Sequence, residues 1–426
     1  MSHSQQVSQQ ETQQETEREF DVIIWGATGF TGKLTAEYLL ERYGLTGSLR
    51  WAIAGRNASK LEETRASLAS ESGIATEALP CVVANADNAD EMRALAARTT
   101  VVCSTVGPYA LYGNHLVAAC AELGTHYCDL TGEAHWMRRM IDAHESTAQA
   151  SGARIVFTCG FDCVPSDLGT FFLQNEMMAR HGVNAAEIKF RVKGFKGGAS
   201  GGTIASMINM MEEASKDPQV MRVMNEPYAL NPPDDQNGPD QAEPTMPAYD
   251  ADFEAWTAPF VMGAINTKVV RRTNSLLDHA YGPDFRYSEA MLAGSGPAGL
   301  AKATGMAASS AAMMGAMSIG PLRRLIAPRL PAPGEGPSKA AREAGYFDIR
   351  LHARHPHDEN KNLRARVTGD RDPGYGSTSK MLAESAVCLA LDDLTSPAGI
   401  LTPAAALGEA YLLRLQKNAG LEFSIE

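Results

Sequence analysis

The chain from residue 20 to residue 160 alternates short apolar runs with longer amphipathic stretches. Apolar runs of this length predict strands, and apolar residues three and four positions apart predict helices. Ala36, Leu39, Leu40 and Tyr43 share one helical face in this way. Strands are expected at residues 21–25, 49–54, 80–84, 100–106, 125–130 and 154–158, with helices at 89–98, 114–123 and 134–150. This alternation predicts an α/β fold whose N-terminal part is a Rossmann doubly wound parallel sheet.

The rhythm changes after residue 167. Between residues 188 and 193 apolar residues alternate with lysine and arginine, which predicts a strand with one solvated face. The glycine-rich stretch 194–203 could be an anion or carbonyl cradle or a flexible turn, and 227–247 predicts an irregular loop. Further strands are expected at 268–273, 286–293, 346–353 and 362–368, the last two as a hairpin, and helices at 204–215, 377–391 and 402–417. This section therefore predicts α+β structure.

Three glycines follow the first strand in the spacing G-x-x-G-x-x-G. Glycine there permits a sharp turn, close approach of a pyrophosphate and tight helix packing, and the helix N-terminus offers N–H groups to phosphate. A glycine triplet alone can be only a turn, but the strand before it and the helix after it favour dinucleotide binding. The predicted cofactor-binding residues here are Gly26, Ala27, Thr28, Gly29, Phe30, Thr31 and Gly32.

The second strand ends in Gly55 and Arg56. A site for NAD would place an acid near this point, and none is found. Arg56, Asn57 and Lys60 could hold a 2′-phosphate by charge-assisted hydrogen bonds, so NADP(H) is favoured over NAD(H). The alternative is that Arg56 is a solvated loop cation. Asp87 follows the third strand, where an adenine-contacting loop would lie.

The fourth strand breaks at Val106, Gly107, Pro108 and Tyr109. Strand ends of this kind line the ligand crevice of a doubly wound sheet, so these residues are expected at the nicotinamide end of the cofactor.

The overall charge argues against one class of partner. The formal net charge is −12 at pH 7, so no general basic field exists to bind nucleic acid. The seven cysteines are odd in number and form no C-x-x-C pair, which predicts reduced thiols in a cytoplasmic protein. No metal site is expected, because His355 and His357 lack a further ligand cluster and should be solvated. Residues 1–19 hold six Gln and four Glu and predict a disordered tail.

Residues 291–322 carry a single charge, Lys302, among many Ala, Gly and Met residues, and Arg323, Arg324 and Arg329 follow. Pro297 and several glycines interrupt the segment, so a transmembrane span is not expected. A mobile helix over an apolar substrate, or an interfacial helix giving peripheral membrane contact through 291–329, fits better. The alternative is an ordinary buried or dimer-interface helix.

Five motifs together resemble the saccharopine dehydrogenase-like oxidoreductases. They are similar to the branch that holds the bacterial trans-acting enoyl reductases and the animal lipid-droplet homologue. The motifs lie at residues 26–32, 54–56, 106–109, 127–133 and 160–169.

After the tail at residues 1–19, the resemblance implies three parts. Residues 20–165 would be the Rossmann dinucleotide-binding domain, 166–395 an inserted α+β substrate and dimerisation domain, and 396–426 a C-terminal helix that returns to the Rossmann domain. It also implies a homodimer and a small-molecule, lipid-like substrate.

Three functions stay open. The first is an NADPH-dependent reductase of a lipid-like enoyl thioester, in which Tyr109 would donate a hydrogen bond to the enolate and Asp129 and Glu133 would relay a proton. These three residues could instead only pack or bond backbone. The second is a saccharopine-type imine or amine dehydrogenase, with Lys189, Arg191, Lys193 and Lys196 as a carboxylate clamp. The third is a non-catalytic cofactor-binding protein at a lipid surface.

Overall fold

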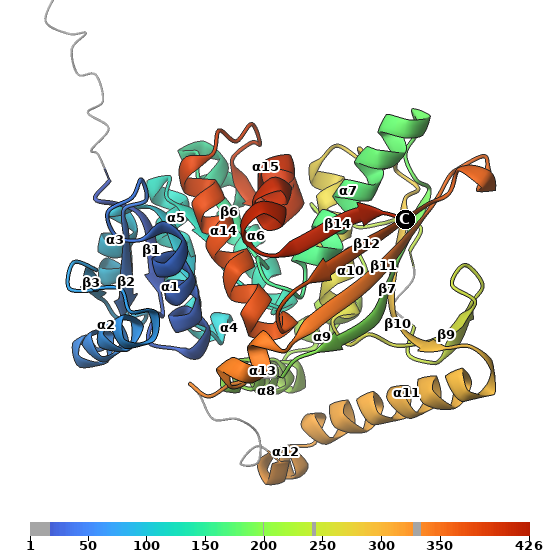
Figure 1. Ribbon diagram of the computed structural model, residues 1–426, viewed down its shortest axis with the longest axis horizontal. Helices are drawn as coiled ribbons and strands as arrows, with labels where there is room; N and C mark the ends of the chain where they lie inside the picture. The colour runs from blue at the N-terminus through green and yellow to red at the C-terminus, as the bar shows by residue number, and fades with distance from the viewer. Residues whose placement is uncertain (1–17, 199, 241–243, 327–333) are drawn as a thin grey trace, which may run out of the picture.

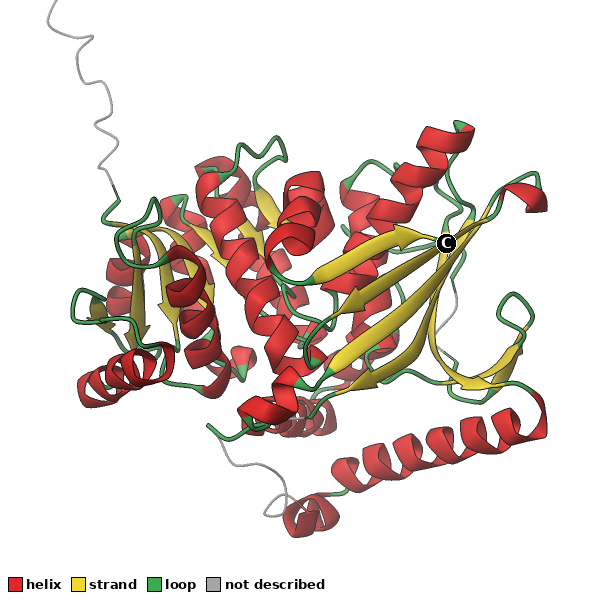
Figure 2. Ribbon diagram, in the orientation of Figure 1, coloured by secondary structure: helices red, strands yellow, loops and turns green. Residues whose placement is uncertain are grey.

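Two seven-stranded sheets organise the molecule (Figure 1). The computed structural model describes residues 18–198, 200–240, 244–326 and 334–426. Figure 2 shows the two groups of strands with helices between and around them. Most of the predicted tail (1–17), part of the predicted loop (241–243) and the end of the apolar segment (327–329) lie outside the described residues.

The first sheet is parallel throughout, in the order β13-β6-β5-β4-β1-β2-β3. Its strands are β1 (Phe20–Trp25), β2 (Trp51–Gly55), β3 (Cys81–Val83), β4 (Thr99–Ser104), β5 (His126–Cys128), β6 (Arg154–Val156) and β13 (Gly399–Leu401). The chain runs from β1 outward to β3 and then from β4 outward to β6. The order therefore reverses between β1 and β4, where a doubly wound sheet binds its ligand. The predicted α/β fold with a Rossmann sheet is confirmed.

Strand β1 is buried on both faces, as its apolar run predicted. Val22 and Ile24 join a core with residues of α1, α2 and α14, whereas Ile23 and Trp25 join a core with residues of α3, α5 and α6. The helices of this part are α1 (Phe30–Tyr43), α2 (Ala58–Ser72), α3 (Ala89–Ala97), α4 (Tyr109–Tyr112), α5 (Asn114–Leu123), α6 (Ala134–Ser151) and the later α14 (Thr378–Leu391). Helices therefore cover both faces of the sheet.

The second sheet is mixed, in the order β14-β12-β11-β7-β10-β9-β8. Only the β7/β10 pair is parallel in the described sheet, and the predicted β11/β12 hairpin is confirmed. Its strands are β7 (Glu187–Lys196), β8 (Ala248–Asp250), β9 (Ala255–Ala258), β10 (Arg286–Gly294), β11 (Tyr346–Arg354), β12 (Leu363–Gly369) and β14 (Leu421–Ile425). The remaining helices are α7 (Val164–His181), α8 (Gly201–Lys216), α9 (Pro218–Asn225), α10 (Gly263–Leu276), α11 (Gly296–Ser318), α12 (Gly320–Ile326), α13 (Lys339–Glu343) and α15 (Pro403–Asn418).

The strand predicted at 268–273 is wrong, because these residues lie in helix α10. Helix α10 buries cations as well as apolar residues, so its sequence shows no clear polar face. The Arg271 guanidinium lies 2.8 Å from a carboxylate oxygen of Asp240, and Arg272 donates to the Ile400 carbonyl at 2.6 Å. These partners come from distant elements and are invisible in a local pattern. Helix α7 was not predicted, although its first residues lie in the 160–169 motif.

His355 is also a correction, because it is buried and not solvated. Its Nδ1 atom accepts the backbone N–H groups of His357 and Asp358 and so closes the hairpin tip. His357 remains exposed, as predicted.

The chain visits the first sheet again after it has built most of the second. Helix α14 lies against β1, β4 and β5, and β13 pairs with β6. The last strand, β14, then pairs with β12 of the second sheet. The C-terminal part of the chain therefore joins both sheets, and the domain limits at 165 and 395 stay a prediction.

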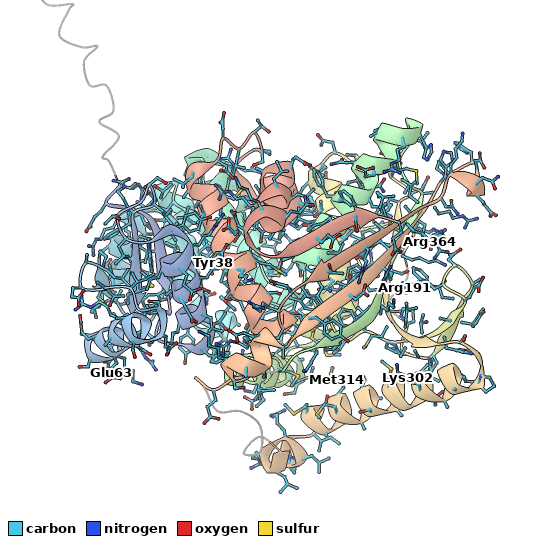
Figure 3. All side chains as sticks on the ribbon, viewed as in Figure 1. Tyr38, Glu63, Arg191, Lys302, Met314 and Arg364 are labelled. Atoms are coloured by element: carbon cyan, nitrogen blue, oxygen red, sulfur yellow. The ribbon has the colours of Figure 1, made fainter. Side chains whose placement is uncertain are left out.

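Glu384 of α14 holds three helices together. Its buried carboxylate accepts the hydroxyl groups of Tyr38 (2.6 Å, labelled in Figure 3) and Tyr43 (2.7 Å) from α1. It also accepts donors from Arg414 and Asn418 of α15, each at 3.1 Å. One buried charge thus satisfies donors from both neighbouring helices.

We expect Glu384→Ala to lower the free energy of unfolding by about 1–3 kcal/mol, because it leaves the Tyr43 hydroxyl without its acceptor and removes one of the two carboxylates that pair with Arg414. Urea unfolding followed by circular dichroism measures this. Glu409→Ala, at an exposed position of α15, is the control and should stay within about 0.5 kcal/mol of the parent. A loss from Glu384→Ala as small as that of the control would contradict the role given to the carboxylate.

Candidate functional site

The glycine turn is closed too tightly for any side chain. Gly26 has φ +92°, and a Cβ there would lie 2.6 Å from the Val106 Cγ2 atom. A Cβ on Gly32 would lie 2.3 Å from the Gly26 carbonyl oxygen. Helix α1 can therefore start directly against the end of β1 only because these two residues are glycine.

The N-terminus of α1 is open to an anion. Its N-cap is Gly29, which has no side chain to accept the first N–H groups, and no acid lies in the first turn. A cavity of about 420 Å³ opens beside this turn and is lined in part by Thr28, Phe30, Lys33 and Arg342. Its volume falls in the usual range of small-molecule sites, and free N–H groups with a positive dipole end suit phosphate.

The end of β2 lies beside the glycine turn. Arg56 is exposed, and no hydrogen bond or ion pair holds its guanidinium within the described part of the chain. Asn57 caps α2, because its Oδ1 atom accepts the Lys60 N–H at 3.0 Å. Lys60 and Asp87 are also exposed. At the end of β2, Arg56 and Lys60 are therefore exposed cations, and the described residues there do not form a preformed phosphate-binding site.

The turn after β4 carries the residues predicted at the nicotinamide end. Val106, Gly107 and Pro108 are half-buried, and the peptide bond between Gly107 and Pro108 is cis. Tyr109 is buried instead, and its hydroxyl donates to the Ser104 carbonyl at 3.2 Å while its ring packs on Trp136. Its hydroxyl is therefore already committed to backbone.

Glu133 joins the ends of β4 and β5. Its two carboxylate oxygens accept the N–H groups of Tyr109 and Ala110, each at 2.9 Å, at the start of α4. Burial raises the pKa of Glu133, and these backbone donors and the Ser206 hydroxyl oppose the rise. Glu133 thus caps a helical turn.

Asp129 is fully buried at the end of β5. One carboxylate oxygen accepts the N–H groups of Thr131 and Thr158, both at 3.1 Å, and the other accepts the Tyr127 hydroxyl at 3.0 Å. Burial raises the pKa of Asp129 to about 7, because these donors only partly replace lost hydration. The carboxylate fastens β5 to β6.

Residues from the part of the chain that forms the second sheet pack over these turns, and they were not predicted as site residues. The Tyr375 ring packs on Phe30 at 5.2 Å between centroids, and its hydroxyl bonds the Thr203 hydroxyl at 2.8 Å. Ser206 of α8 lies over the β4 turn, since a Cβ on Gly107 would come within 3.1 Å of its Oγ atom. Of the stretch 194–203, residues 194–196 end β7, Ser200 caps α8 and residues 201–203 begin that helix. Tyr375 belongs to a Gly-Tyr-Gly turn, and this turn was the sequence feature that could have identified it as a site residue.

The turn after β6 carries Asp162, which lies in the 160–169 motif and was not predicted as a site residue. It is half-buried, and burial raises its pKa to about 6. Neighbouring Phe161 donates its N–H to the Thr378 hydroxyl at 2.9 Å, which ties this turn to α14.

The cations proposed as a carboxylate clamp mostly have partners inside the protein. Arg191 lies 2.7 Å from Asp250, which also lies 3.4 Å from Lys189. Lys193 lies 3.9 Å from Asp348. Figure 3 labels Arg191 on the second sheet, away from the glycine turn. Three of the four cations are therefore balanced already, which disfavours a clamp for a tricarboxylate.

Helix α11 runs along the outside of the molecule (Figure 1). Of its 23 residues only Gly299, Ala303 and Met317 are buried. Lys302 and Met314, labelled in Figure 3, lie along it. In the part of the chain that the structure describes, no helix is both long and apolar enough to cross a membrane.

Two further groups of residues bear on the chemistry. All seven cysteines are free thiols, and all but Cys81 are buried. Over the described ranges, no group of three or more His, Cys, Asp or Glu side chains is placed to hold a metal ion.

Comparison with known proteins decides the family. The model of the saccharopine dehydrogenase NADP binding domain matches residues 22–156. A Mycobacterium tuberculosis protein assigned to the trans-acting enoyl reductases is 43% identical over 411 residues, covering 93% of this chain and 95% of its own length. The trans-acting enoyl reductase of Mycobacterium leprae is 37% identical over 413 residues, covering 93% and 96%. That of Mycobacterium ulcerans is 37% identical over 422 residues, covering 94% and 96%.

This chain belongs to the trans-acting enoyl reductase family. The resemblance seen in the motifs is confirmed, and so is the prediction of an NADP-dependent oxidoreductase of the saccharopine dehydrogenase-like group. The matched NADP-binding domain contains the glycine turn, Arg56 and the β4 turn. The predicted preference for NADP(H) agrees with that match.

Proposed function

We propose that this protein reduces an enoyl thioester with a lipid-like acyl chain, using NADPH. The observation that carries the proposal is the reversal point of the first sheet, where the glycine turn and the turns after β4 to β6 share one edge and α8 and Tyr375 pack over them. The names of relatives that match over most of the chain support the same reaction.

The cofactor would lie across the carboxyl edge of the first sheet. The open N-terminus of α1 suits its pyrophosphate, and the exposed Arg56 suits its 2′-phosphate. Asn57 already uses its Oδ1 atom as a cap, so only its amide nitrogen would be left to donate. The assigned residues are Gly26, Ala27, Thr28, Gly29, Phe30, Thr31, Gly32, Gly55, Arg56, Asn57, Lys60, Asp87, Val106, Gly107, Pro108 and Tyr109.

Bound NADPH supplies the hydride that is added at the β-carbon of the substrate. The protein must then stabilise an enolate and deliver one proton to the α-carbon. Tyr109, Asp129 and Glu133 stay predictions for these roles, but each already bonds protein groups. To act chemically, each would have to give up a bond that now shapes the crevice wall.

The α11–α12 segment supports an apolar substrate drawn from a lipid surface. Exposed Met313, Leu322 and Leu325 keep 50%, 42% and 61% of their surface open. Residues 291–334 contain no Asp or Glu, although the whole chain is acidic. An exposed apolar helix with cations and no acids suits an anionic lipid interface. We therefore infer a cytoplasmic protein that contacts membranes peripherally.

The direct test of the reaction is consumption of NADPH in the presence of long-chain enoyl thioesters. We expect loss of NADPH absorbance and a saturated thioester in the mass spectrum, with a preference for long chains because an apolar site gains affinity with each buried methylene. A short crotonyl thioester is the control. Absence of turnover across all chain lengths would refute the proposed reaction.

Arg56→Ala tests the choice of cofactor. NADPH binding should weaken about 10- to 100-fold, the worth of hydrogen bonds to a charged group, and NADH binding about twofold at most. Quenching of tryptophan fluorescence measures both affinities. Arg65→Ala, farther along α2 and paired with Glu62, is the matched control. Equal losses for the two cofactors would remove Arg56 from the 2′-phosphate site.

The lipid contact is tested by replacing exposed apolar residues of the α11–α12 segment with glutamine. The combined variant Leu300→Gln, Met313→Gln, Leu322→Gln and Leu325→Gln should lower binding to anionic phosphatidylglycerol vesicles at least about tenfold. A control pair, Leu391→Gln and Leu413→Gln, changes similarly exposed residues elsewhere. This pair should leave vesicle binding unchanged.

The predicted homodimer is the competing occupant of this surface. Light scattering without lipid distinguishes a dimer contact from a lipid contact. If the parent chain is a dimer and the fourfold variant is a monomer, a second copy and not lipid covers α11.

A further inference from the structure

One carboxylate at the crevice has no protein partner. Asp162 follows β6, within a tight turn in which Cys163 and Val164 donate their N–H groups to the Gly160 carbonyl. Through the described parts of the chain, no hydrogen bond or ion pair reaches the Asp162 carboxylate. A half-buried carboxylate without a donor is costly, and such groups concentrate at functional sites.

The other acids at this edge are used differently. Asp129 accepts three hydrogen bonds and Glu133 accepts two backbone N–H groups. Both carboxylates therefore hold turns in place. Asp162 lies at the end of the strand next to them, since β6 pairs with β5, yet its oxygens hold nothing. It is free to contact a bound molecule.

The turn that carries Asp162 is rigid on both sides. Phe161 bonds Thr378 through its N–H, and its ring packs on Phe347 of the second sheet at 4.9 Å between centroids. Cys163 is buried and its thiol lies 3.4 Å from the Asn266 side-chain oxygen. The neighbours of Asp162 are thus anchored, and a carboxyl group held between them is preorganised for a reaction.

The Asp162 turn lies beside the turn that carries Tyr375, since Phe161 donates its N–H to Thr378, three residues after Tyr375. The titratable groups that interact with its charge are Cys163 in its own turn and Tyr375 from the roof. The Tyr375 ring touches Phe30 of the glycine turn. The turns that carry Phe30, Tyr375 and Asp162 are therefore neighbours at the carboxyl edge of the first sheet.

We propose that Asp162 is the acid that protonates the α-carbon of the substrate, an inference that rests on the proposed enoyl reduction. The hydride supplied by NADPH forms a C–H bond at the β-carbon, and the electrons of the C=C bond move to form the enolate. The enolate then forms a C–H bond at the α-carbon as the O–H bond of Asp162 breaks. The resulting carboxylate regains its proton from solvent water.

The environment suits this role. Burial raises the pKa of Asp162 to about 6, so a useful fraction is protonated near neutral pH, where a general acid works best. The side chain is only half-buried, which leaves water a path to restore the proton. Since the acid must be protonated, the turnover rate should fall as pH rises through this pKa.

The test compares the parent chain with Asp162→Asn, Asp162→Glu and the exposed control Asp393→Asn. Turnover with a long-chain enoyl thioester should fall about 10²- to 10⁴-fold in Asp162→Asn, which is the usual contribution of a general acid. The fall with rising pH should disappear, and NADPH affinity should stay within about twofold. Asp162→Glu keeps a carboxyl group and should retain the pH-dependent fall.

Two readouts do not depend on the rate. In deuterated water the parent should place deuterium on one face of the α-carbon, and Asp162→Asn should lose this selectivity, because solvent protonates either face. Carbon-13 NMR of aspartate-labelled protein should show a carboxyl that titrates near pH 6 in the parent. That signal should be absent from Asp162→Asn.

The outcomes separate the two proposals. If the parent is active and Asp162→Asn keeps more than about a third of the rate with unchanged selectivity, the proton role is wrong and the enoyl reduction stands. If the parent reduces no enoyl thioester, the proposed reaction and the proposed role of Asp162 are both wrong. If Asp162→Asn does not fold, the pH profile of Asp162→Glu decides. A different carboxylic acid should keep the fall in rate but move its midpoint, and a midpoint unchanged from that of Asp393→Asn overturns the proposal.

Discussion

No side-chain atom fits between the start of α1 and the end of β1. A Cβ on Gly32 would lie 2.3 Å from the Gly26 carbonyl oxygen, well inside van der Waals contact. This constraint brings the N-terminus of α1 to the carboxyl edge of the sheet, beside the β4 turn. The open N–H groups, the reversal of strand order and the crevice all follow from this close approach.

The second sheet completes what the first one begins. Its part of the chain supplies α8 and Tyr375, which cover the turns after β1 and β4. The chain then returns through α14, whose buried Glu384 joins α1 to α15. The roof and the floor of the crevice are therefore linked by one continuous set of packed helices, and the crevice depends on both sheets for its shape. Helix α11 packs on β9, β10 and α8 but buries only three of its residues, so most of its surface remains open for contact with lipid or a second copy.

The parts of the fold that the sequence predicted well are those with local causes. The run from Val22 to Trp25 is buried on both faces, so its uninterrupted apolar character was enough to identify a central parallel strand. The glycine spacing likewise reflects contacts within one strand–turn–helix unit. Helix α10 was not predicted because Arg271 and Arg272 are buried against partners distant in the sequence, Asp240 in a loop and Ile400 in β13. The prediction that His355 is solvated was wrong for a similar reason. Its ring nitrogen accepts a hydrogen bond from a backbone N–H whose position depends on the folded hairpin tip.

The sequence by itself determined the family, the cofactor class and the place where phosphate would bind, because glycine sterics and strand burial act between residues close in the chain. Only the tertiary structure decided which acids are free to act. Asp129, Glu133 and Asp162 look alike in the sequence, each at or shortly after the end of a predicted strand. Backbone N–H groups donate hydrogen bonds to the carboxylates of Asp129 and Glu133, whereas none of the described residues donates one to the Asp162 carboxylate. Hydrogen-bond partners come from other elements, so the same residue type fastens a turn at one strand end and stays open to a substrate at the next.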